Sequence, residues 1–185
     1  METTVVPIDS EQISEEKIEK AALLIKKGEI VAFPTETVYG LGGDALNPAA
    51  SRKIYQAKGR SFTKPLIVLI ASMEDLGQIV SEIPENARKL AEAFWPGPLT
   101  MVLKKSVKVP YETAGGKETI AVRMTSSPIA RALTIASGGF LTAPSANISG
   151  KPSPTLAEHV LGDLNGKIPM ILDGGESGSG IESTI

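Results

Sequence analysis

The chain has 185 residues, of which 42% are hydrophobic, so it can bury one substantial core but is short for two domains. Its net charge of −2 provides no overall attraction to nucleic acid or to an anionic membrane, and any polyanion must be bound by a local cluster. Cysteine is absent and His159 is the single histidine, which argues against disulfides, thiolate metal sites, a multi-histidine metal site and a Ser-His-Asp triad.

The sequence shows no targeting or membrane-spanning pattern. Residues 1–9 lack a charged region followed by an apolar core, and no apolar run approaches the roughly 20 residues that a membrane span needs. The absence of cysteine suits a reducing compartment. We therefore expect a soluble, cytoplasmic protein, and we interpret His159 as an ordinary helix residue.

Predicted helices and strands alternate along the whole chain. Ser10 or Ser14 can cap a first helix that runs to about Lys27, and Gly28 supplies its stop. Further helices are predicted at 48–59, 72–80, 84–95, 128–137 and 155–161. Strands are predicted at 30–33, 66–70, 99–103, 119–123, 140–143 and 168–172. This alternation predicts a single α/β domain over residues 1–185, with a twisted, mixed, open sheet and helices packed on it.

The stretch 34–44, PTETVYGLGGD, follows the apolar run at 30–33 and is the first candidate site. It places hydroxyls, the carboxylate of Glu36 and three glycines where the strand should end. In an α/β sheet, ligands bind beyond such strand ends. The alternative is a hairpin turn in which Thr35, Glu36 and Thr37 merely cap backbone donors. On these residues alone, both interpretations stay open.

Basic residues are segregated along the chain. No acidic residue lies between Asp44 and Glu74, a segment that contains Arg52, Lys53, Lys58, Arg60 and Lys64. No acidic residue lies between Glu118 and Glu158 either, where Arg123, Arg131 and Lys151 occur. A single such charge is best explained as a solvated surface group. Because Lys58, Arg60 and Lys64 fall together between a helix end and a buried strand, they indicate a site for a phosphorylated ligand.

The common nucleotide-binding signatures are absent. The run GLGG at 40–43 lacks the third glycine of GxGxxG, and Lys117 is followed by Glu118 where a Walker motif needs Ser or Thr. A nucleotide would therefore bind in another way. The glycine-rich segment 174–180 is either a loop that approaches phosphate or a flexible end, and its composition favours the flexible end.

Seven motifs resemble, in order and spacing, those of the YrdC-like threonylcarbamoyl-AMP synthases. They are PTETVYGLG at 34–42, KGR at 58–60 with PL at 65–66, WPGPLT at 95–100, AVR at 121–123, APSAN at 143–147, PSPT at 152–155 and ESTI at 182–185. The resemblance implies a YrdC-like fold and an L-threonylcarbamoyladenylate synthase, a nucleotidyltransferase that condenses L-threonine, bicarbonate and ATP and releases pyrophosphate. It also implies a downstream threonylcarbamoyl transferase complex, which modifies the adenosine beside the anticodon of certain tRNAs.

The same resemblance assigns roles by position. Lys58 and Arg60 are implied as catalytic residues. The nucleotide-binding residues that it implies are Lys58, Arg60, Lys64, Thr119, Ser145, Asn147 and Ser153. The threonine-binding residues that it implies are Thr37, Leu69, Arg123, Ala143 through its backbone, and Ser183. Mg²⁺ should accompany ATP, and Glu36, Asp44 and Glu182 remain open as its ligands.

Three departures from the family pattern stand out. Leu69 replaces a histidine that many members carry near the threonine pocket, and Ser61 replaces a frequent proline. The chain also ends at Ile185, where the family continues into another strand and an arginine that reaches the nucleotide. Either the sequence is truncated after the STI motif or its nucleotide site is incomplete.

Two other functions compete with the synthase. One is an RNA-binding module that uses the same basic concave surface, against which the net charge and the 4% aromatic content argue. The other is the carbamoyl-transfer domain of hydrogenase-maturation proteins, which lies beside cysteine-rich zinc modules and so fits a cysteine-free chain poorly. Direct contact with tRNA stays open, and no membrane partner is expected.

Overall fold

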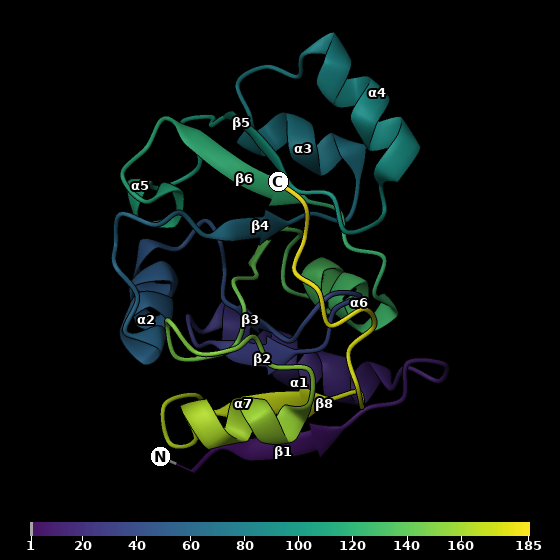
Figure 1. The fold of residues 1–185 in the computed structure, drawn as a ribbon, viewed down its shortest axis with the longest axis vertical. Coiled ribbons are helices and arrows are strands. Elements are labelled where there is room, and N and C mark those ends of the chain that lie inside the picture. The colour runs from purple at the N-terminus through teal and green to yellow at the C-terminus, as the bar shows by residue number, and fades with distance from the viewer. Residues whose placement is uncertain (1) are drawn as a thin grey trace.

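The computed structural model describes residues 2–185 and consists of strands and helices in alternation (Figure 1). Its strands are β1 (Thr4–Pro7), β2 (Val31–Phe33), β3 (Gly40–Gly42), β4 (Ile67–Leu69), β5 (Met101–Lys104), β6 (Thr119–Arg123), β7 (Leu141–Thr142) and β8 (Met170–Asp173). Its helices are α1 (Glu15–Lys26), α2 (Pro48–Lys58), α3 (Met73–Ile79), α4 (Glu85–Phe94), α5 (Tyr111–Ala114), α6 (Pro128–Ala136) and α7 (Ala157–Leu164).

The strands form two four-stranded mixed sheets, in the orders β1-β8-β2-β3 and β5-β6-β4-β7. In the first sheet β1, β8 and β2 are parallel and β3 is antiparallel to β2. In the second, the parallel pair β4 and β6 is flanked by antiparallel β7 and β5. Isolated bridges from Gly40 to Ser145 and from Asp44 to Leu141 join the two sheets. The predicted α/β fold with mixed pairing is confirmed, but the strands form two sheets where one open sheet was predicted.

The ends of the helices follow from the capping residues in the sequence. Ser14, and not Ser10, caps α1 by accepting from the amide of Lys17. Asn47 caps α2 through the amide of Ala49, and α2 ends at Gly59 in the left-handed conformation, which glycine adopts without strain. The loop after α2 therefore begins at Gly59 and leads directly into β4.

Three elements were not predicted from the sequence. The strand β1 is short and largely exposed, and α5 is a single turn. The strand β3 has the sequence GLG, and glycine is rare in strands. Here a side chain at Gly42 would lie 2.5 Å from the ring of Phe33, so the close packing of β3 on β2 requires glycine. The helix α7 also begins later and ends later than predicted.

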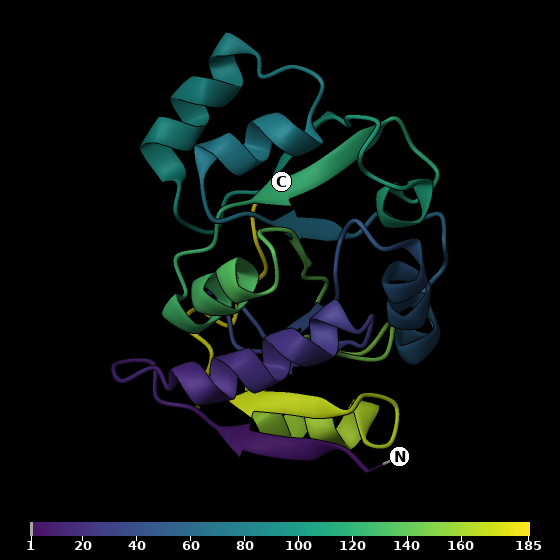
Figure 2. The ribbon, with the colours of Figure 1, turned by 180° about the vertical axis from the view of Figure 1, so that it is seen from behind.

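Helices cover both faces of the first sheet. Figure 2 shows α1 and α6 together on one face, and α7 contacts β8 on the other. Val31 and Phe33 pack toward α1 and α6, whereas Ala32 packs toward α2 and α7, as the alternation along a strand requires. The second sheet packs against α3 and α4 in a separate core. Within residues 2–185, no helix is long and apolar enough to cross a membrane.

The segment after β8 crosses from the first sheet to the second (Figure 1). Ser179 and Gly180 donate backbone hydrogen bonds to Glu36 and Thr37, and Thr184 pairs with the backbone at Pro98 and Thr100. A side chain at Gly178 would lie 2.5 Å from the carbonyl oxygen of Glu36. Because these contacts fix the segment along its length, the interpretation as a flexible end is wrong.

Candidate active site

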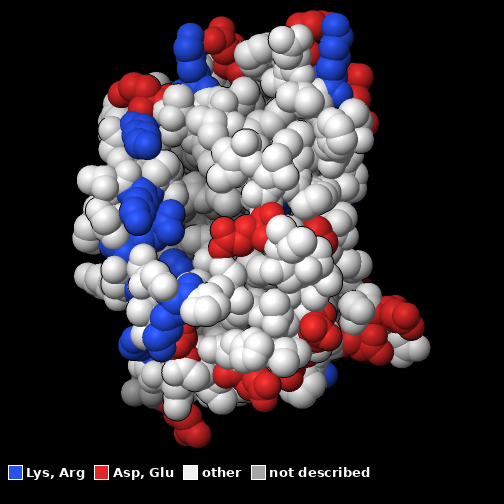
Figure 3. Space-filling model, in the orientation of Figure 1, with Lys and Arg blue, Asp and Glu red and all other residues white. Residues whose placement is uncertain are grey.

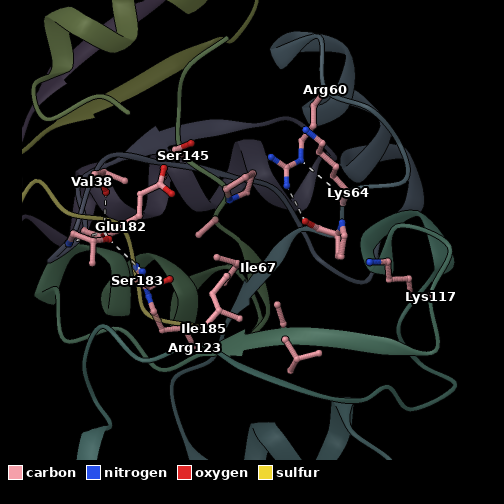
Figure 4. A pocket seen from close by; sticks show the side chains of 18 of the residues that line it. Val38, Arg60, Lys64, Ile67, Lys117, Arg123, Ser145, Glu182, Ser183 and Ile185 are labelled. Atoms are coloured by element: carbon pink, nitrogen blue, oxygen red, sulfur yellow. Dashed lines mark hydrogen bonds between the residues drawn. The ribbon is translucent and has the colours of Figure 1, made fainter. Parts of the chain in front are cut away.

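A cavity of about 430 Å³ opens where the two sheets and the C-terminal segment meet (Figure 4). Its walls combine residues of the 34–44 stretch, of the loop after α2, of β4 to β6, of the loop after β7 and of the C-terminal segment. They are Thr35, Thr37, Val38, Gly40, Arg60, Thr63, Lys64, Pro65, Ile67, Val102, Lys117, Ala121, Arg123, Ala143, Pro144, Ser145, Glu182, Ser183 and Ile185.

The cavity wall is strongly basic although the protein is acidic overall. Arg60, Lys64, Lys117 and Arg123 line it, and Glu182 is the one acidic residue among the lining residues. Figure 4 shows Arg60, Lys64 and Lys117 on one side, and Arg123 with Ser183 on the other. In Figure 3, Lys and Arg side chains gather along the edge of the molecule where α2 and α5 lie. The cavity can therefore hold two anionic groups at separate ends.

The loop after α2 presents the first basic end. The guanidinium of Arg60 donates to the carbonyl oxygen of Pro65 at 3.1 Å, and Tyr55 donates its hydroxyl to the carbonyl oxygen of Lys64 at 2.9 Å. Burial lowers the pKa of Arg60, although its side chain keeps a solvent-accessible part at the cavity. The loop is thus braced by its own carbonyls, and Arg60 and Lys64 both line the cavity as predicted.

Lys58 does not line this cavity. Its side chain is only 1% exposed, and its ammonium donates to the carbonyl oxygens of Ser145 and Asn147 and, at 3.4 Å, to the Asn147 side chain. Burial, followed by the nearby charge of Arg60, lowers the pKa of Lys58 to about 8, while Glu182 and Asp163 act against this shift. In this structure the ammonium group of Lys58 binds carbonyl groups of the 143–147 loop behind Ser145. It therefore supports that loop and does not face the cavity, where its contact with phosphate was predicted.

Arg123 forms the second basic end, at the end of β6. It is 4% exposed, and its Nη1 donates to Oγ1 of Thr37 at 3.2 Å. Its Nε lies 3.7 Å from Oε1 of Glu36. Burial lowers the pKa of Arg123, and the charge of Glu36 opposes that shift. Ser183 reaches the same wall, with its hydroxyl 2.8 Å from that of Thr100.

The structure brings together seven of the predicted site residues and leaves the others outside the cavity wall. Thr37, Arg60, Lys64, Arg123, Ala143, Ser145 and Ser183 line it. Leu69 lies on the same face of β4 as Ile67, but farther along the strand, where it is fully buried in the core with residues of α6. Leu69 therefore does not line the cavity, and the threonine contact predicted for it has no place in this structure.

The remaining predicted residues lie nearby. Asn147 and Ser153 line an adjoining hollow of about 340 Å³ together with His159 and Asp163. The hydroxyl of Ser153 donates to Glu182, which lines the main cavity, so the two spaces share a wall. Thr119 begins β6 outside the lining set. His159 belongs to α7, as predicted, and its ring nitrogen faces Thr155.

Sequence reasoning missed Lys117 and Val102 as wall residues, and it left Glu36 undecided. Lys117 precedes β6 in a bend, so the alternation of the strand does not reach it, and no local pattern indicated that it lines the cavity. The carboxylate of Glu36 accepts a hydrogen bond from Thr125, a residue that carried no motif. Nothing in the spacing of residues 36 and 125 could have indicated this contact.

Comparisons with known proteins decide the family. The Sua5/YciO/YrdC family model, described as "Telomere recombination", matches residues 23–185. A threonylcarbamoyl-AMP synthase of Pyrococcus abyssi is 55% identical over 175 residues, which cover 95% of this chain and 52% of the relative. The chain belongs to the Sua5/YciO/YrdC family. The family predicted from the seven motifs is thereby confirmed.

Two further matches agree. A threonylcarbamoyl-AMP synthase of Bacillus subtilis is 51% identical over 179 residues, covering 96% of this chain and 51% of the relative. The crystal structure of P. abyssi Sua5 complexed with L-threonine has a TM-score of 0.96 and 54% identity, and covers 98% of this chain and 53% of that one. The chain therefore spans about half the length of the relatives that it matches.

Proposed function

We propose that this chain carries an L-threonylcarbamoyladenylate synthase activity, a nucleotidyl transfer that condenses L-threonine, bicarbonate and ATP and releases pyrophosphate in the cytoplasm. The observation that carries the proposal is one cavity with two basic ends, Arg123 with Thr37 and Ser183 at one and Arg60 with Lys64 at the other. The printed names of the P. abyssi and B. subtilis relatives support the activity. The L-threonine in the P. abyssi structure supports the amino acid.

The amino-acid end offers groups suited to threonine. The guanidinium of Arg123 can take a carboxylate in a two-point contact, which is the strongest arrangement of charge-assisted hydrogen bonds. The hydroxyls of Thr37 and Ser183 and the backbone at Ala143 are small and close enough to hold the substrate hydroxyl and the carbamate formed from bicarbonate. Ile67, Ala121 and the other apolar wall residues can take the substrate methyl group.

The nucleotide end offers positive charge and a hydroxyl. Arg60 and Lys64 can neutralise the phosphates of ATP, and the hydroxyl-bearing Ser145 lines the same cavity. A carbamate oxygen then attacks the α-phosphorus, the bond to the β-phosphate breaks, and pyrophosphate leaves. Such a step depends on positioning and on charge neutralisation, and it needs no nucleophile from the protein.

Mg²⁺ would arrive with the phosphates of ATP, where it neutralises charge on the leaving group. Three carboxylates were considered as its ligands, and two of them already have partners within the protein. Asp44 accepts a hydrogen bond from the amide of Leu46, and Glu36 faces Arg123. Glu182 also accepts a hydrogen bond, from Ser153, but it is the one of the three that lines the cavity and can reach the phosphates. Among residues 2–185, no group of three or more His, Asp or Glu side chains is arranged to hold a metal ion. One carboxylate with substrate phosphates is a common Mg²⁺ arrangement.

The product would be passed to a downstream threonylcarbamoyl transferase complex that modifies tRNA. The test is pyrophosphate release by the purified protein with L-threonine, bicarbonate, Mg²⁺ and ATP, together with detection of the adenylate by mass spectrometry. Release should stop when threonine is omitted and should fall in carbonate-depleted buffer. No threonine-dependent release would refute the proposal, and RNA binding that weakens steeply with salt, without ATP use, would favour the RNA-binding alternative.

A further inference from the structure

Glu36 lies at the point where three segments of the chain meet. It belongs to the 34–44 stretch between β2 and β3, next to the end of β6 and beneath the C-terminal segment. Its backbone carbonyl accepts the amide of Ser179 at 3.0 Å. Its neighbours Thr35 and Thr37 line the cavity, whereas Glu36 lies behind that wall. Its side chain is therefore placed to act on other wall residues.

The two carboxylate oxygens of Glu36 have different surroundings. Oε2 accepts the hydroxyl hydrogen of Thr125, which is fully buried and also accepts the amide of Ser127 at 3.2 Å. Oε1 is buried and, within residues 2–185, has no hydrogen-bond partner. It lies 3.7 Å from Nε of Arg123, which is itself buried and without a hydrogen bond in the same part of the chain. One oxygen is thus anchored, and the other faces the guanidinium.

This arrangement determines the direction of the Arg123 guanidinium. The group is planar, so contacts on its Nε and Nη1 atoms fix the direction of the remaining edge. Nη1 is bound by Thr37 at 3.2 Å, and Glu36 lies on the Nε side. Arg123 lines the cavity, and its remaining edge carries no protein hydrogen bond in residues 2–185. A carboxylate that enters the cavity would meet this edge.

The separation of 3.7 Å between Glu36 and Arg123 is longer than a hydrogen bond. A tight bidentate pair would occupy the guanidinium and compete with a substrate carboxylate. A buried arginine with no counter-charge would be unstable, because burial of an unpaired charge is costly. Glu36 at this distance compensates the charge and leaves the hydrogen-bonding edge of Arg123 available.

We propose that Glu36 is a positioning residue for amino-acid binding, whose carboxylate, anchored by Thr125, holds the Arg123 guanidinium toward the cavity for the substrate carboxylate. This inference rests on the proposed function. The two alternatives from the sequence do not fit the side chain, since within residues 2–185 no backbone amide donates to its carboxylate, and that carboxylate contacts Thr125 and Arg123 and is not among the groups that line the cavity.

The test separates the side chain of Glu36 from its backbone, which carries the contact with the C-terminal segment. Glu36→Gln keeps the shape and the backbone but removes the charge and turns an amide toward Arg123. In the pyrophosphate assay we expect the KM for L-threonine to rise at least tenfold, with kcat and the KM for ATP changed less than twofold. Glu82→Gln, which removes an exposed carboxylate paired with Lys104, is the matched control and should change none of these values.

Two further variants test the proposed chain of contacts. Thr125→Val removes the anchor but not the charge, and should raise the threonine KM by about threefold. Glu36→Asp keeps the charge and should restore part of the lost affinity. Combined with Arg123→Lys, Glu36→Gln should add little, because both changes act on the same contact. Calorimetric titration with L-threonine should reproduce each ratio without turnover.

The outcomes distinguish this inference from the proposed function. Wild-type protein that neither binds L-threonine nor releases pyrophosphate would refute both. Active wild-type protein with an unchanged threonine KM in Glu36→Gln, or with equal losses toward threonine and ATP, would refute the role of Glu36 alone. If Glu36→Gln does not fold, Thr125→Val decides the question, together with the ¹H–¹⁵N resonance of Arg123 Nε in the wild-type protein. That resonance should shift on addition of L-threonine, and an unchanged resonance would overturn the inference.

Discussion

The burial of Lys58 makes a prediction about stability that can be worked through with its sign. The pKa of Lys58 is about 8 in the folded protein and 10.5 in an unfolded chain. Between these two pH values the unfolded chain binds a proton that the folded chain does not, so the free energy of unfolding rises with pH. Below about pH 8 the folded protein carries the full cost of the buried ammonium group.

The magnitude follows from the difference between the two pKa values, which corresponds to about 3 kcal/mol when the whole range is crossed. Between pH 7 and pH 9.5, loss of the Lys58 proton from the folded protein should raise the free energy of unfolding by about 2 kcal/mol. Lys58→Met keeps the length of the side chain but cannot titrate. The wild-type protein should therefore gain about 2 kcal/mol relative to Lys58→Met over this interval, whatever the constant offset from the lost hydrogen bonds.

The assay is urea unfolding of both proteins at pH 7 and pH 9.5. Tyr39 and Tyr55 also have raised pKa values because of burial, but they are present in both proteins and cancel in the comparison. A ¹³C NMR titration of the lysine ε carbons in the wild-type protein measures the same pKa directly. A pH-independent difference in stability, or a Lys58 pKa above 10, would refute the lowering of this pKa by burial.

The other predictions concern the two ends of the cavity and its C-terminal wall. Arg60→Ala should raise the KM for ATP roughly 30-fold, and Arg123→Ala should raise the KM for threonine by a similar factor, since a charged hydrogen bond contributes about 2 kcal/mol. Steady-state kinetics with each substrate varied in turn measures both constants. The assignment would be contradicted if each variant raised the KM for ATP and the KM for threonine equally. Gly178→Ala should cost about 1–3 kcal/mol by pressing a methyl group on the Glu36 carbonyl, and should increase proteolysis of the 177–184 segment, so an unchanged cleavage rate would argue against the close packing. Leu69→His should destabilise the protein by about 3 kcal/mol because it places an unpaired polar ring in the core, and a neutral effect on urea unfolding would mean that residue 69 can reach the cavity.

The helices and the central strands could be predicted because their signals are local. Caps at Ser14, Asn47 and Ser72 and the glycine stops fix helix ends within a few residues of the chain. The strand β3 could not be predicted in this way, since its glycines argue against a strand. It forms because a glycine at position 42 lets the backbone pack against Phe33, a condition set by tertiary structure.

The site residues follow the same rule: local signals predicted some of them, whereas positions set by distant contacts could not be predicted. Arg60, Lys64 and Arg123 were predicted from charge segregation and motif position, and all three line one cavity. The position of Lys58 behind Ser145 depends on carbonyl groups 87 and 89 residues away, which no pattern near Lys58 records. The C-terminal segment was misjudged because its glycines were taken as a sign of freedom, whereas Gly178 serves a close approach to Glu36.

The proposed function requires a protein with a net charge of −2 to bind an anionic nucleotide and an amino acid in one cavity. A uniformly basic surface would attract many polyanions, but here the acidic residues balance the basic ones over the whole chain, while four basic residues share a cavity wall with one acidic residue. Within that wall, Arg123 is buried and compensated by Glu36, whereas Lys64 is exposed at the other end. A small carboxylate gains most at the buried end, where water is excluded, and flexible phosphates are accommodated at the open end. The two ends thus differ in burial, and in the proposed reaction this difference would orient L-threonine and ATP in the cavity.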